Sequence, residues 1–317
     1  MTSLPLVSII IPCYNSATYV GDAIQSGIGQ TYRNCEVIVI DDGSTDGSLD
    51  VIRSFGDAIR WETGPNRGAA AARNRGIELA RGELVQFLDS DDLLHSEKLD
   101  RQVPLVVAKV ADIVFCDRET YPIAHPEQAR IESTGYGEGE DAIVLCAGRF
   151  LQIHTSLHWR SVLKSFHGFR EDLRNWEDYE LYLRLACAGL SFHRMPEALC
   201  VRRRVADSLS SGSLPQALDV HDGILWQAYN QLAQADKLTD ERARAFGECM
   251  ATDARLYMKF GQYDKARDYF TYALKMHPGS LLGAHAAFPR TKGFLLRVFG
   301  PIVTERLAVL YRTLRTR

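Results

Sequence analysis

Four polar residues, Asp89–Asp92 with the sequence DSDD, follow directly on the apolar run Leu84–Leu88. The apolar run predicts a buried strand, so these carboxylates lie where that strand leaves its sheet. In open α/β sheets, ligands bind in the crevice outside the carboxyl ends of the strands. Carboxylate oxygens at that edge suit Mg²⁺ or Mn²⁺ together with substrate phosphates. The same residues could instead form an acidic turn before a helix that begins near Ser96.

A second acidic pair, Asp41-Asp42, follows the apolar segment Glu36–Ile40. Parallel strands present their carboxyl ends at the same edge of a sheet, so the two acidic clusters can share one cleft. The alternative is that each cluster begins the next helix independently, and residues 44–46 (STD) are suitable helix caps.

An alternation of strands and helices must position these acids. Residues 7–11 (VSIII) predict a strand buried on both faces, which Pro12 ends. The pattern continues with helix 17–30, strand 36–40, helix 47–55, strand 58–61, helix 69–81 and strand 83–88. This order predicts an α/β fold with a mostly parallel sheet flanked by helices.

The composition is that of a soluble globular protein. The chain has 317 residues, of which 46% are hydrophobic and 24% charged, and its net charge is −3. The seven cysteines form no Cys-x-x-Cys pair, which disfavours zinc ribbons and disulfide frameworks. The N-terminus has no signal-like segment, so we expect a cytoplasmic location. We also expect no nucleic-acid partner.

Five segments together resemble the family 2 glycosyltransferases over about residues 6–215. They are residues 7–15 (VSIIIPCYN), residues 36–44 (EVIVIDDGS), Asn66–Gly68 with Ala72–Asn74, the acids Asp89–Asp92, and Gly168–Glu171 followed by Glu177–Leu181. The resemblance implies a GT-A fold, which is a Rossmann-like, mostly parallel sheet flanked by helices. It also implies transfer of a sugar, with inversion, from a nucleotide diphosphate sugar, and a UDP-sugar is the expected donor.

The resemblance also implies roles for single residues. Asp42 matches the residue that recognises the nucleotide base. Asp89 and Asp91 match the D-x-D motif, with Asp91 as the direct ligand of Mn²⁺ or Mg²⁺ and Asp92 as a possible substitute. Asp178 falls where the family places its general base. Pro12 and Ser90 belong to the same motifs and are expected at the donor site.

The chemistry of sugar transfer agrees with these roles. A divalent ion neutralises the charge that develops on a diphosphate leaving group. One carboxylate then suffices to take the proton of the acceptor hydroxyl. Asp178 begins an expected helix, so the alternative is that Asp178 and its neighbour Glu177 only complement the helix dipole. We favour catalysis for Asp178 and a supporting role for Glu177.

Three arginines are candidate phosphate ligands. Arg67 and Arg73 flank the start of the Ala-rich helix, and a guanidinium there could hold phosphate oxygens in fork geometry, although either could simply be solvated. Arg202 precedes residues 207–210 (DSLS), where the family often has an Arg-x-His element, and Arg204 stands where that His is expected. Arg202 is therefore either a diphosphate contact or part of an exposed basic turn.

Two histidines, His154 and His158, have the spacing of two metal ligands on one helical face. A position before Trp159 would place them on the acceptor side of the cleft. No nearby acid or third ligand supports a zinc site, and we prefer ordinary surface or core histidines.

After residue 215 the sequence reads as helical, which divides the chain into a catalytic domain (1–215) and a helical C-terminal domain (216–317). Residues 254–278 have the spacing of one tetratricopeptide-like hairpin, which could pack on its neighbours or bind a protein partner. Residues 290–317 carry seven basic side chains and one acid. The stretch 294–317 predicts a basic amphipathic tail that either packs on the protein or contacts the inner face of the membrane.

The leading interpretation is an inverting, non-processive glycosyltransferase that acts on a glycan or lipid-linked acceptor in cell-surface polysaccharide biosynthesis. A sugar nucleotidyltransferase is the alternative enzyme, but such enzymes open with a Gly-rich loop where this chain has Cys13-Tyr14-Asn15. A non-enzymatic scaffold acting through the helical domain is the third interpretation, and it would predict loss of the catalytic acids. The donor sugar and the acceptor depend on residues 117–160 and on the helical domain.

Overall fold

The computed structural model describes residues 4–137, 139–148, 151–204, 214–281, 300–304 and 306. The chain forms two compact units, Met1–Ala142 with Phe150–Gly212 and Ile143–Arg149 with Ser213–Arg317. Residues 143–149 therefore cluster with the later helices. The domain division at residue 215 stays a prediction.

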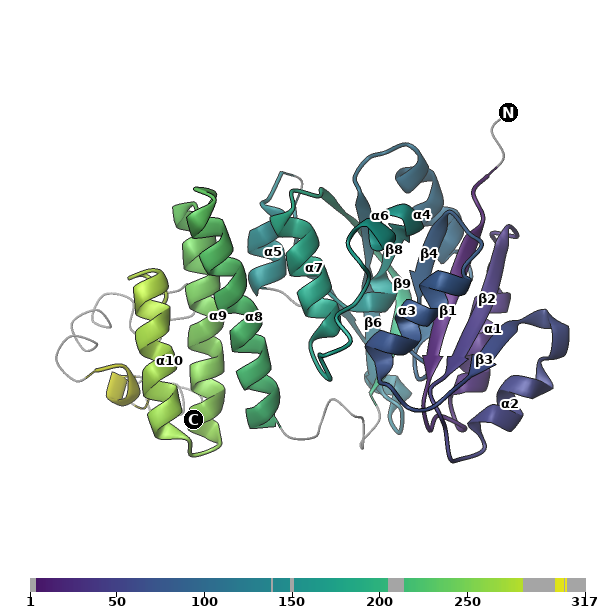
Figure 1. The fold of residues 1–317 in the computed structure, drawn as a ribbon, viewed down its shortest axis with the longest axis horizontal. Helices are drawn as coiled ribbons and strands as arrows, with labels where there is room; N and C mark the ends of the chain where they lie inside the picture. Colours follow the sequence, from purple (N-terminus) through teal and green to yellow (C-terminus); the bar gives the residue numbers. More distant parts are fainter. Residues whose placement is uncertain are drawn as a thin grey trace. The chain divides into compact units, whose positions relative to one another are not determined.

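The first half of the first unit is the expected β/α alternation (Figure 1). Its elements are β1 (Val7–Cys13), α1 (Val20–Ile28), β2 (Cys35–Asp41), α2 (Ser48–Ser54), β3 (Arg60–Thr63), α3 (Ala69–Leu79) and β4 (Leu84–Phe87). The strands β3, β2, β1 and β4 lie in this order and pair in parallel. The sequence pattern predicted each of these elements to within a few residues.

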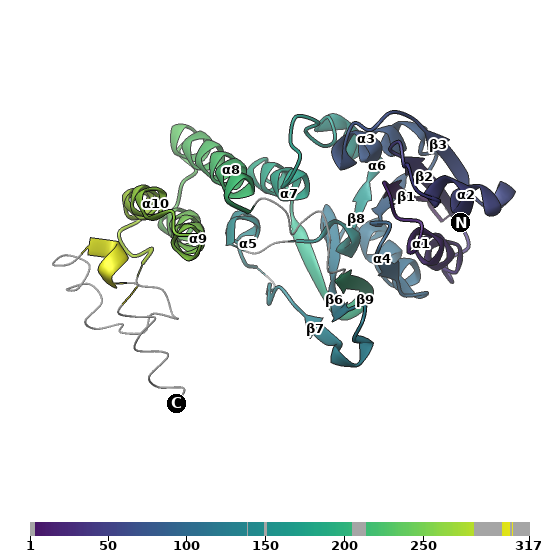
Figure 2. The same cartoon turned by 90° about the horizontal axis from the view of Figure 1, so that it is seen from below.

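Helices cover both faces of this sheet because alternate side chains of β1 are buried on opposite sides. Val7, Ile9 and Ile11 lie in one core with residues of α1, α2 and α4 (Lys98–Val107). On the other face, α3 comes so close that a Cβ on Gly76 would lie 2.2 Å from a methyl carbon of Ile10. Figure 2 shows α3 on one side of the strands and α1 and α4 on the other.

Pro12 does not end the first strand, which corrects the sequence-based prediction. β1 continues through Pro12 to Cys13, and Pro12 pairs with Ile40 in the register with β2. The Ile10 carbonyl accepts a hydrogen bond from the backbone N–H of Leu88, so the backbone of Ile10 faces β4. Because a strand repeats every two residues, the backbone nitrogen of Pro12 faces the same side as Ile10. The ladder with β4 ends at Ile10, so the missing N–H of Pro12 removes no hydrogen bond of the sheet.

The second half makes the sheet mixed. It adds β5 (Leu93–Leu94), β6 (Ile113–Pro122), β7 (Arg130–Glu132), β8 (Ser156–Trp159) and β9 (Phe192–Arg204), with the helices α6 (Arg160–Ser165) and α7 (Glu177–Cys187). β8 lies between β4 and β6 and is antiparallel to both, whereas β9 is parallel to β6. The nine-stranded sheet runs β3-β2-β1-β4-β8-β6-β9-β5, with β7 paired to β6. The fold is α/β, as predicted.

The second unit is helical. It contains most of α5 (Ala142–Gly148), together with α8 (Leu214–Gln234), α9 (Asp240–Lys259) and α10 (Tyr263–Met276). α9 and α10 pack closely because small residues face the contact: Ala254, Ala266 and Ala273 have no exposed surface. The predicted C-terminal helices are thus confirmed within the described residues, and the tetratricopeptide-like character of this part stays a prediction. Within the described residues, no helix has the length and apolar character needed to cross a membrane.

Candidate active site

The two predicted acidic clusters lie at the carboxyl ends of neighbouring parallel strands. β2 ends at Asp41, and β4 ends two residues before Asp89. β1 lies between β2 and β4 and pairs with both, so both clusters open at the same edge of the sheet. A backbone hydrogen bond of 3.0 Å from Asp92 N–H to the Asp89 carbonyl closes the acidic segment into a turn.

Asp42 is buried and shapes the loop before α3. Its Oδ1 accepts a 2.8 Å hydrogen bond from the Arg67 backbone N–H, and its Oδ2 accepts one of 2.8 Å from Gly68 N–H. Gly68 has a φ of 97°, which favours glycine. A carboxylate has about four lone-pair positions, so Asp42 can accept a further N–H from a nucleotide base. Its role as a base-recognition residue stays a prediction.

Arg73 links the two halves of the site. Its guanidinium donates 2.7 Å hydrogen bonds to Asp89 Oδ1 at the end of β4 and to Glu177 Oε1 at the start of α7. Its side chain is 5% exposed and lies over the Phe169 ring at 5.4 Å. Burial opposes the charged form of Arg73, but Asp89, Glu177 and Asp178 outweigh it and raise the Arg73 pKa. Arg73, a candidate phosphate ligand from the sequence, therefore holds the carboxylates of Asp89 and Glu177 together.

Asp178 lies in the first turn of α7, beside Glu177. Its Oδ1 accepts a 2.8 Å hydrogen bond from Tyr179 N–H, and part of its surface stays open. Burial and repulsion by Glu177 raise the Asp178 pKa to about 8, although Arg73 acts in the opposite direction. A general base works best when its pKa is near the operating pH. The residue before this turn, Trp176, has a φ of 66°, a conformation that bulky residues rarely adopt.

The acids after β4 differ in their electrostatic environments. Burial alone would raise the Asp89 pKa, but the charges of Arg73, His154 and Arg202 lower it. Asp91 is half-buried, and burial together with repulsion by Asp92 and Asp89 raises its pKa to about 7. An added cation would relieve this repulsion. The oxygen donors and the unbalanced negative charge therefore fit a divalent ion at this turn.

Asp92 and His154 form a buried pair behind the turn. Asp92 Oδ2 lies 3.1 Å from His154 Nδ1, which is an ion-pair distance without the alignment of a hydrogen bond. Asp92 Oδ1 accepts a 2.9 Å hydrogen bond from the backbone N–H of Arg203. One ligand atom from each of Asp89, Asp92 and His154 lies within 4.8 Å of the others. Asp91, the predicted direct ligand, is not a member of this group in the described part of the chain.

Arg203 is a structural residue that the sequence reasoning missed. Its Nη1 lies 2.7 Å from Asp22 Oδ2, its Nε donates to the Asp91 carbonyl, and it lies over the Tyr19 ring. It thereby joins β9 to the acidic turn and to α1. Alternation along β9 leaves Arg202 partly exposed on the opposite side, where its charge acts on Asp89. Treating residues 201–204 as a strand with alternating sides would have predicted that Arg202 and Arg203 face opposite ways.

The histidine pair does not lie on one helix. His154 belongs to a 3₁₀ turn, Ile153–Thr155, and His158 belongs to β8. Both side chains are fully buried. His158 contacts the Tyr182 hydroxyl at 3.3 Å, and burial lowers its pKa to about 3, which makes it a neutral core residue as preferred. The helical spacing was misleading because the chain becomes a strand between the two histidines.

Asn74 attaches the segment Gly168–Glu171 to α3. Its amide forms two hydrogen bonds with the backbone of Phe169, of 2.8 and 2.9 Å, and a third of 3.0 Å with Glu171. Gly168 has a φ of 64°, and a Cβ there would lie 2.3 Å from Asn74 Oδ1. This contact explains physically why Asn74 and Gly168 occur together in the sequence.

Two other predicted donor-site residues have partners within the protein. Arg67 is mostly exposed and forms a 2.7 Å ion pair with Glu171. Ser90 is buried and donates a 2.8 Å hydrogen bond to Ser16 Oγ. Donor-binding roles for Pro12, Arg67, Ser90 and Arg202 stay predictions. Residues 207–210 and 307–317 lie outside the described residues, as does most of the tail 294–306.

Comparison with known proteins identifies the family. The model of Glycosyl transferase family 2 matches residues 8–176, and the chain belongs to this family. A glycosyltransferase of Haemophilus influenzae is 35% identical over 190 residues, which are 57% of this chain and 72% of that protein. The putative teichuronic acid biosynthesis glycosyltransferase TuaG of Bacillus subtilis is 30% identical over 65% of this chain and 82% of its own length.

Solved structures share the fold. S. aureus TarS 1-349 in complex with UDP-GlcNAc has a TM-score of 0.68 at 16% identity, covering 98% of this chain and 92% of that chain. The mannosyltransferase PcManGT of Pyrobaculum calidifontis, in complex with GDP-Man and Mn²⁺, has a TM-score of 0.56 at 19% identity, with 88% of each chain covered. The chain thus has the GT-A fold that its sequence predicted, and it is a transferase of the glycosyltransferase class.

Proposed function

We propose that this chain transfers a sugar, with inversion and without processive polymerisation, from a nucleotide diphosphate sugar to a hydroxyl of a glycan or lipid-linked acceptor. The observation that carries the proposal is the Arg73 bridge, which connects Asp89 to Glu177, next to Asp178. It brings the predicted leaving-group side and the predicted proton-accepting side into one electrostatic unit. The name of TuaG supports a place in cell-surface polysaccharide synthesis.

In the proposed reaction, Asp178 accepts the proton of the acceptor hydroxyl as that oxygen attacks the anomeric carbon of the donor. The bond between the sugar and the diphosphate breaks, and the nucleoside diphosphate leaves from the opposite face. Asp42 contacts the nucleotide base. Arg73 holds Asp89 and Glu177 so that the leaving group and the base keep a fixed separation.

We further propose that Asp91 and Asp89 hold Mn²⁺ or Mg²⁺ at the acidic turn. The ion would supply positive charge to the diphosphate leaving group. The Asp91 pKa is raised by burial first and then by the negative charges of Asp92 and Asp89, and these neighbouring charges support the assignment. The two related structures contain UDP-GlcNAc in one case and GDP-Man with Mn²⁺ in the other, and a UDP-sugar remains our expected donor.

A panel of nucleotide sugars, measured by thermal shift with and without Mn²⁺, tests the donor and the metal together. We expect one donor to raise the melting temperature only when Mn²⁺ is present. Asp91→Asn should remove most of this metal-dependent shift, because one charged ligand is lost. Asp172→Asn is the matched control, since Asp172 is an exposed acid paired with Arg170. A flat panel, or a shift that Asp91→Asn leaves intact, would contradict the metal assignment.

Residues 294–317 form a basic segment for which we propose peripheral contact with an anionic membrane surface. The proposal depends on sequence alone, because most of this segment lies outside the described residues. We expect a chain that ends near residue 290 to move from the membrane fraction to the supernatant on cell fractionation. Unchanged recovery in the membrane fraction would show that the tail does not anchor the protein.

A further inference from the structure

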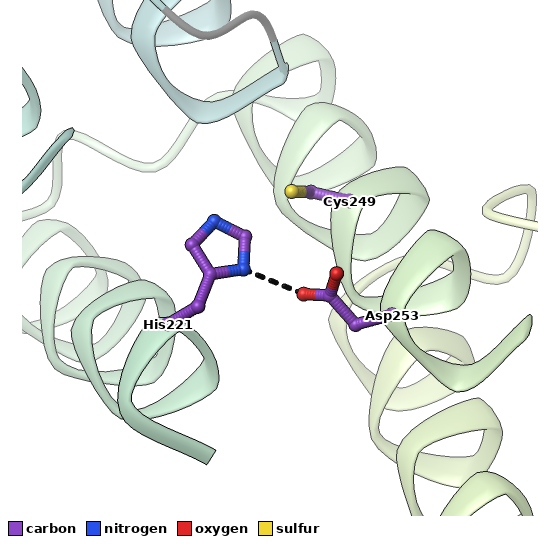
Figure 3. A group of neighbouring side chains, drawn as sticks. All are labelled: His221, Cys249 and Asp253. Atoms are coloured by element: carbon purple, nitrogen blue, oxygen red, sulfur yellow. Dashed lines mark hydrogen bonds and ion pairs between the residues drawn. The ribbon is translucent and has the colours of Figure 1, made fainter. Parts of the chain in front are cut away.

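A second group of metal-ligating side chains lies in the helical unit. His221 comes from α8, and Cys249 and Asp253 come from α9 (Figure 3). One ligand atom of each residue lies within 4.8 Å of the other two. His221 Nδ1 and Asp253 Oδ2 are 2.6 Å apart. This group shares no residue with the acidic turn of the first unit.

Helix geometry explains why the three residues meet. Cys249 and Asp253 are four residues apart on α9, so their side chains lie on the same face of that helix. Figure 3 shows both side chains directed toward His221. His221 and Asp253 are each 4% exposed, and Cys249 is half-buried. The group is therefore largely shielded from water, and Cys249 is its most exposed member.

Asp222, the next residue after His221 in α8, adds a buried carboxyl group near these ligands. Its side chain is 4% exposed, and its Oδ2 accepts a 3.3 Å hydrogen bond from the Tyr257 hydroxyl. Its Oδ1 has no hydrogen-bond partner among the residues that the structure describes. A buried carboxyl oxygen without a donor is costly. The carboxyl groups of Asp222 and Asp253 interact, so a cation bound beside Asp253 would offset negative charge from both.

We propose that His221, Cys249 and Asp253 bind a divalent transition-metal ion of the zinc type. Zinc combines thiolate, imidazole and carboxylate ligands in tetrahedral sites at bond lengths of about 2.0–2.3 Å. Such bonds place ligand atoms roughly 3.3–3.8 Å apart, so His221 and Asp253 must separate by only about 1 Å.

The ligand chemistry distinguishes this site from the acidic turn of the first unit. A cysteine thiolate favours zinc-type ions over Mg²⁺, which prefers oxygen ligands. Binding would release the thiol proton of Cys249 and leave His221 neutral. The thiolate and the Asp253 carboxylate would then balance the charge of the ion. Because the ligands come from both α8 and α9, the ion would join these helices and stabilise the unit.

Cobalt absorption tests the proposal on the full-length, reduced and metal-stripped protein. We expect one equivalent of Co²⁺ to give the intense thiolate-to-cobalt charge-transfer band and the visible bands of a tetrahedral site. Cys249→Ser should lose the charge-transfer band, and Asp253→Asn should weaken cobalt binding. Cys35→Ser, a half-buried cysteine of β2, is the matched control and should keep the band.

Thermal unfolding provides the second measurement. Zn²⁺ should raise the melting temperature of the parent and of Cys35→Ser but not of Cys249→Ser. Asp91→Asn should keep the charge-transfer band, which separates this site from the acidic turn. A parent without the band, or the same band in Cys249→Ser, would overturn the proposal.

Discussion

Replacing Asp178 with asparagine is expected to lower the rate of sugar transfer by about 10²–10⁴-fold, because an amide cannot accept the proton of the acceptor hydroxyl. Asparagine keeps the size of the side chain and the oxygen that accepts from Tyr179 N–H. It also removes a charge that Glu177 repels. We therefore expect unchanged donor affinity and a melting temperature equal to or above that of the parent, measured by steady-state kinetics, donor titration and thermal unfolding.

The pH dependence of transfer provides an internal check. The base must be deprotonated, so kcat/KM should rise with pH through the Asp178 pKa of about 8 and reach a plateau above it. Glu177→Gln removes the neighbouring negative charge, which lowers the Asp178 pKa and moves the rising limb to lower pH. The residual activity of Asp178→Asn should lack this limb.

The alternative role for Asp178 predicts a different outcome. If Asp178 only complements the dipole of α7, Asp178→Asn should lower stability by a few tenths of a kcal/mol and leave the rate unchanged. Loss of donor affinity would instead place Asp178 on the donor side of the site. The exposed Asp172→Asn serves as the control for a general effect of removing an acid in this segment.

Replacing Arg73 with methionine is expected to destabilise the protein by about 3–5 kcal/mol, because it leaves Asp89 and Glu177 without their buried partner. Methionine retains contact with the Phe169 ring. The Asp89 pKa, which Arg73 helps to lower in the parent, should rise in the variant. Denaturant unfolding should show a smaller loss of stability at pH 5 than at pH 8, because protonation neutralises the unpaired acids.

Arg67→Met is the matched control for this prediction. Arg67 forms one ion pair at the surface, with 67% of its side chain exposed, so its loss should cost less than about 1 kcal/mol. Arg73→Lys keeps the charge but cannot contact both acids in fork geometry, and an intermediate loss of stability and activity is expected. Equal stability of Arg73→Met and Arg67→Met would show that the bridge does not hold the site together.

The parallel half of the sheet could be predicted from sequence because its signals are local. Runs such as Ile9–Ile11 and Val37–Ile40 are continuous and apolar, as expected of strands covered on both faces. Whether Pro12 ends its strand depends on whether a neighbouring strand needs a hydrogen bond at that position. Only the assembled sheet shows that β4 does not. The antiparallel strand β8 inserts between β4 and β6, which are about 70 and 45 residues away from it in the chain. Local sequence patterns carry little information about such distant pairings.

Within the site, residue types and short motifs predicted which acids would gather but not what each one contacts. The resemblance placed Asp42, Asp89 and Asp178 in one functional set. The position of Arg73 at a helix start predicted either a phosphate ligand or a solvated side chain, and the structure shows it bonded to Asp89 and to Glu177, which is 104 residues away. His154 was set aside as a metal ligand because no third ligand was evident in the sequence, and only the fold brings it to Asp92.

The sequence alone determined the family, the α/β class and the positions of the acidic clusters at strand ends, because each depends on contiguous residues. Only the tertiary structure decided which charges are paired and which are not. The charge of Arg73 helps to lower the Asp89 pKa, whereas burial and the charges of Asp92 and Asp89 raise the Asp91 pKa. The physical reason is that charges a few ångströms apart in a low-dielectric interior shift one another's pKa values strongly. Such distances between Asp89–Asp92, Arg73 and Asp178 exist only once the chain has folded.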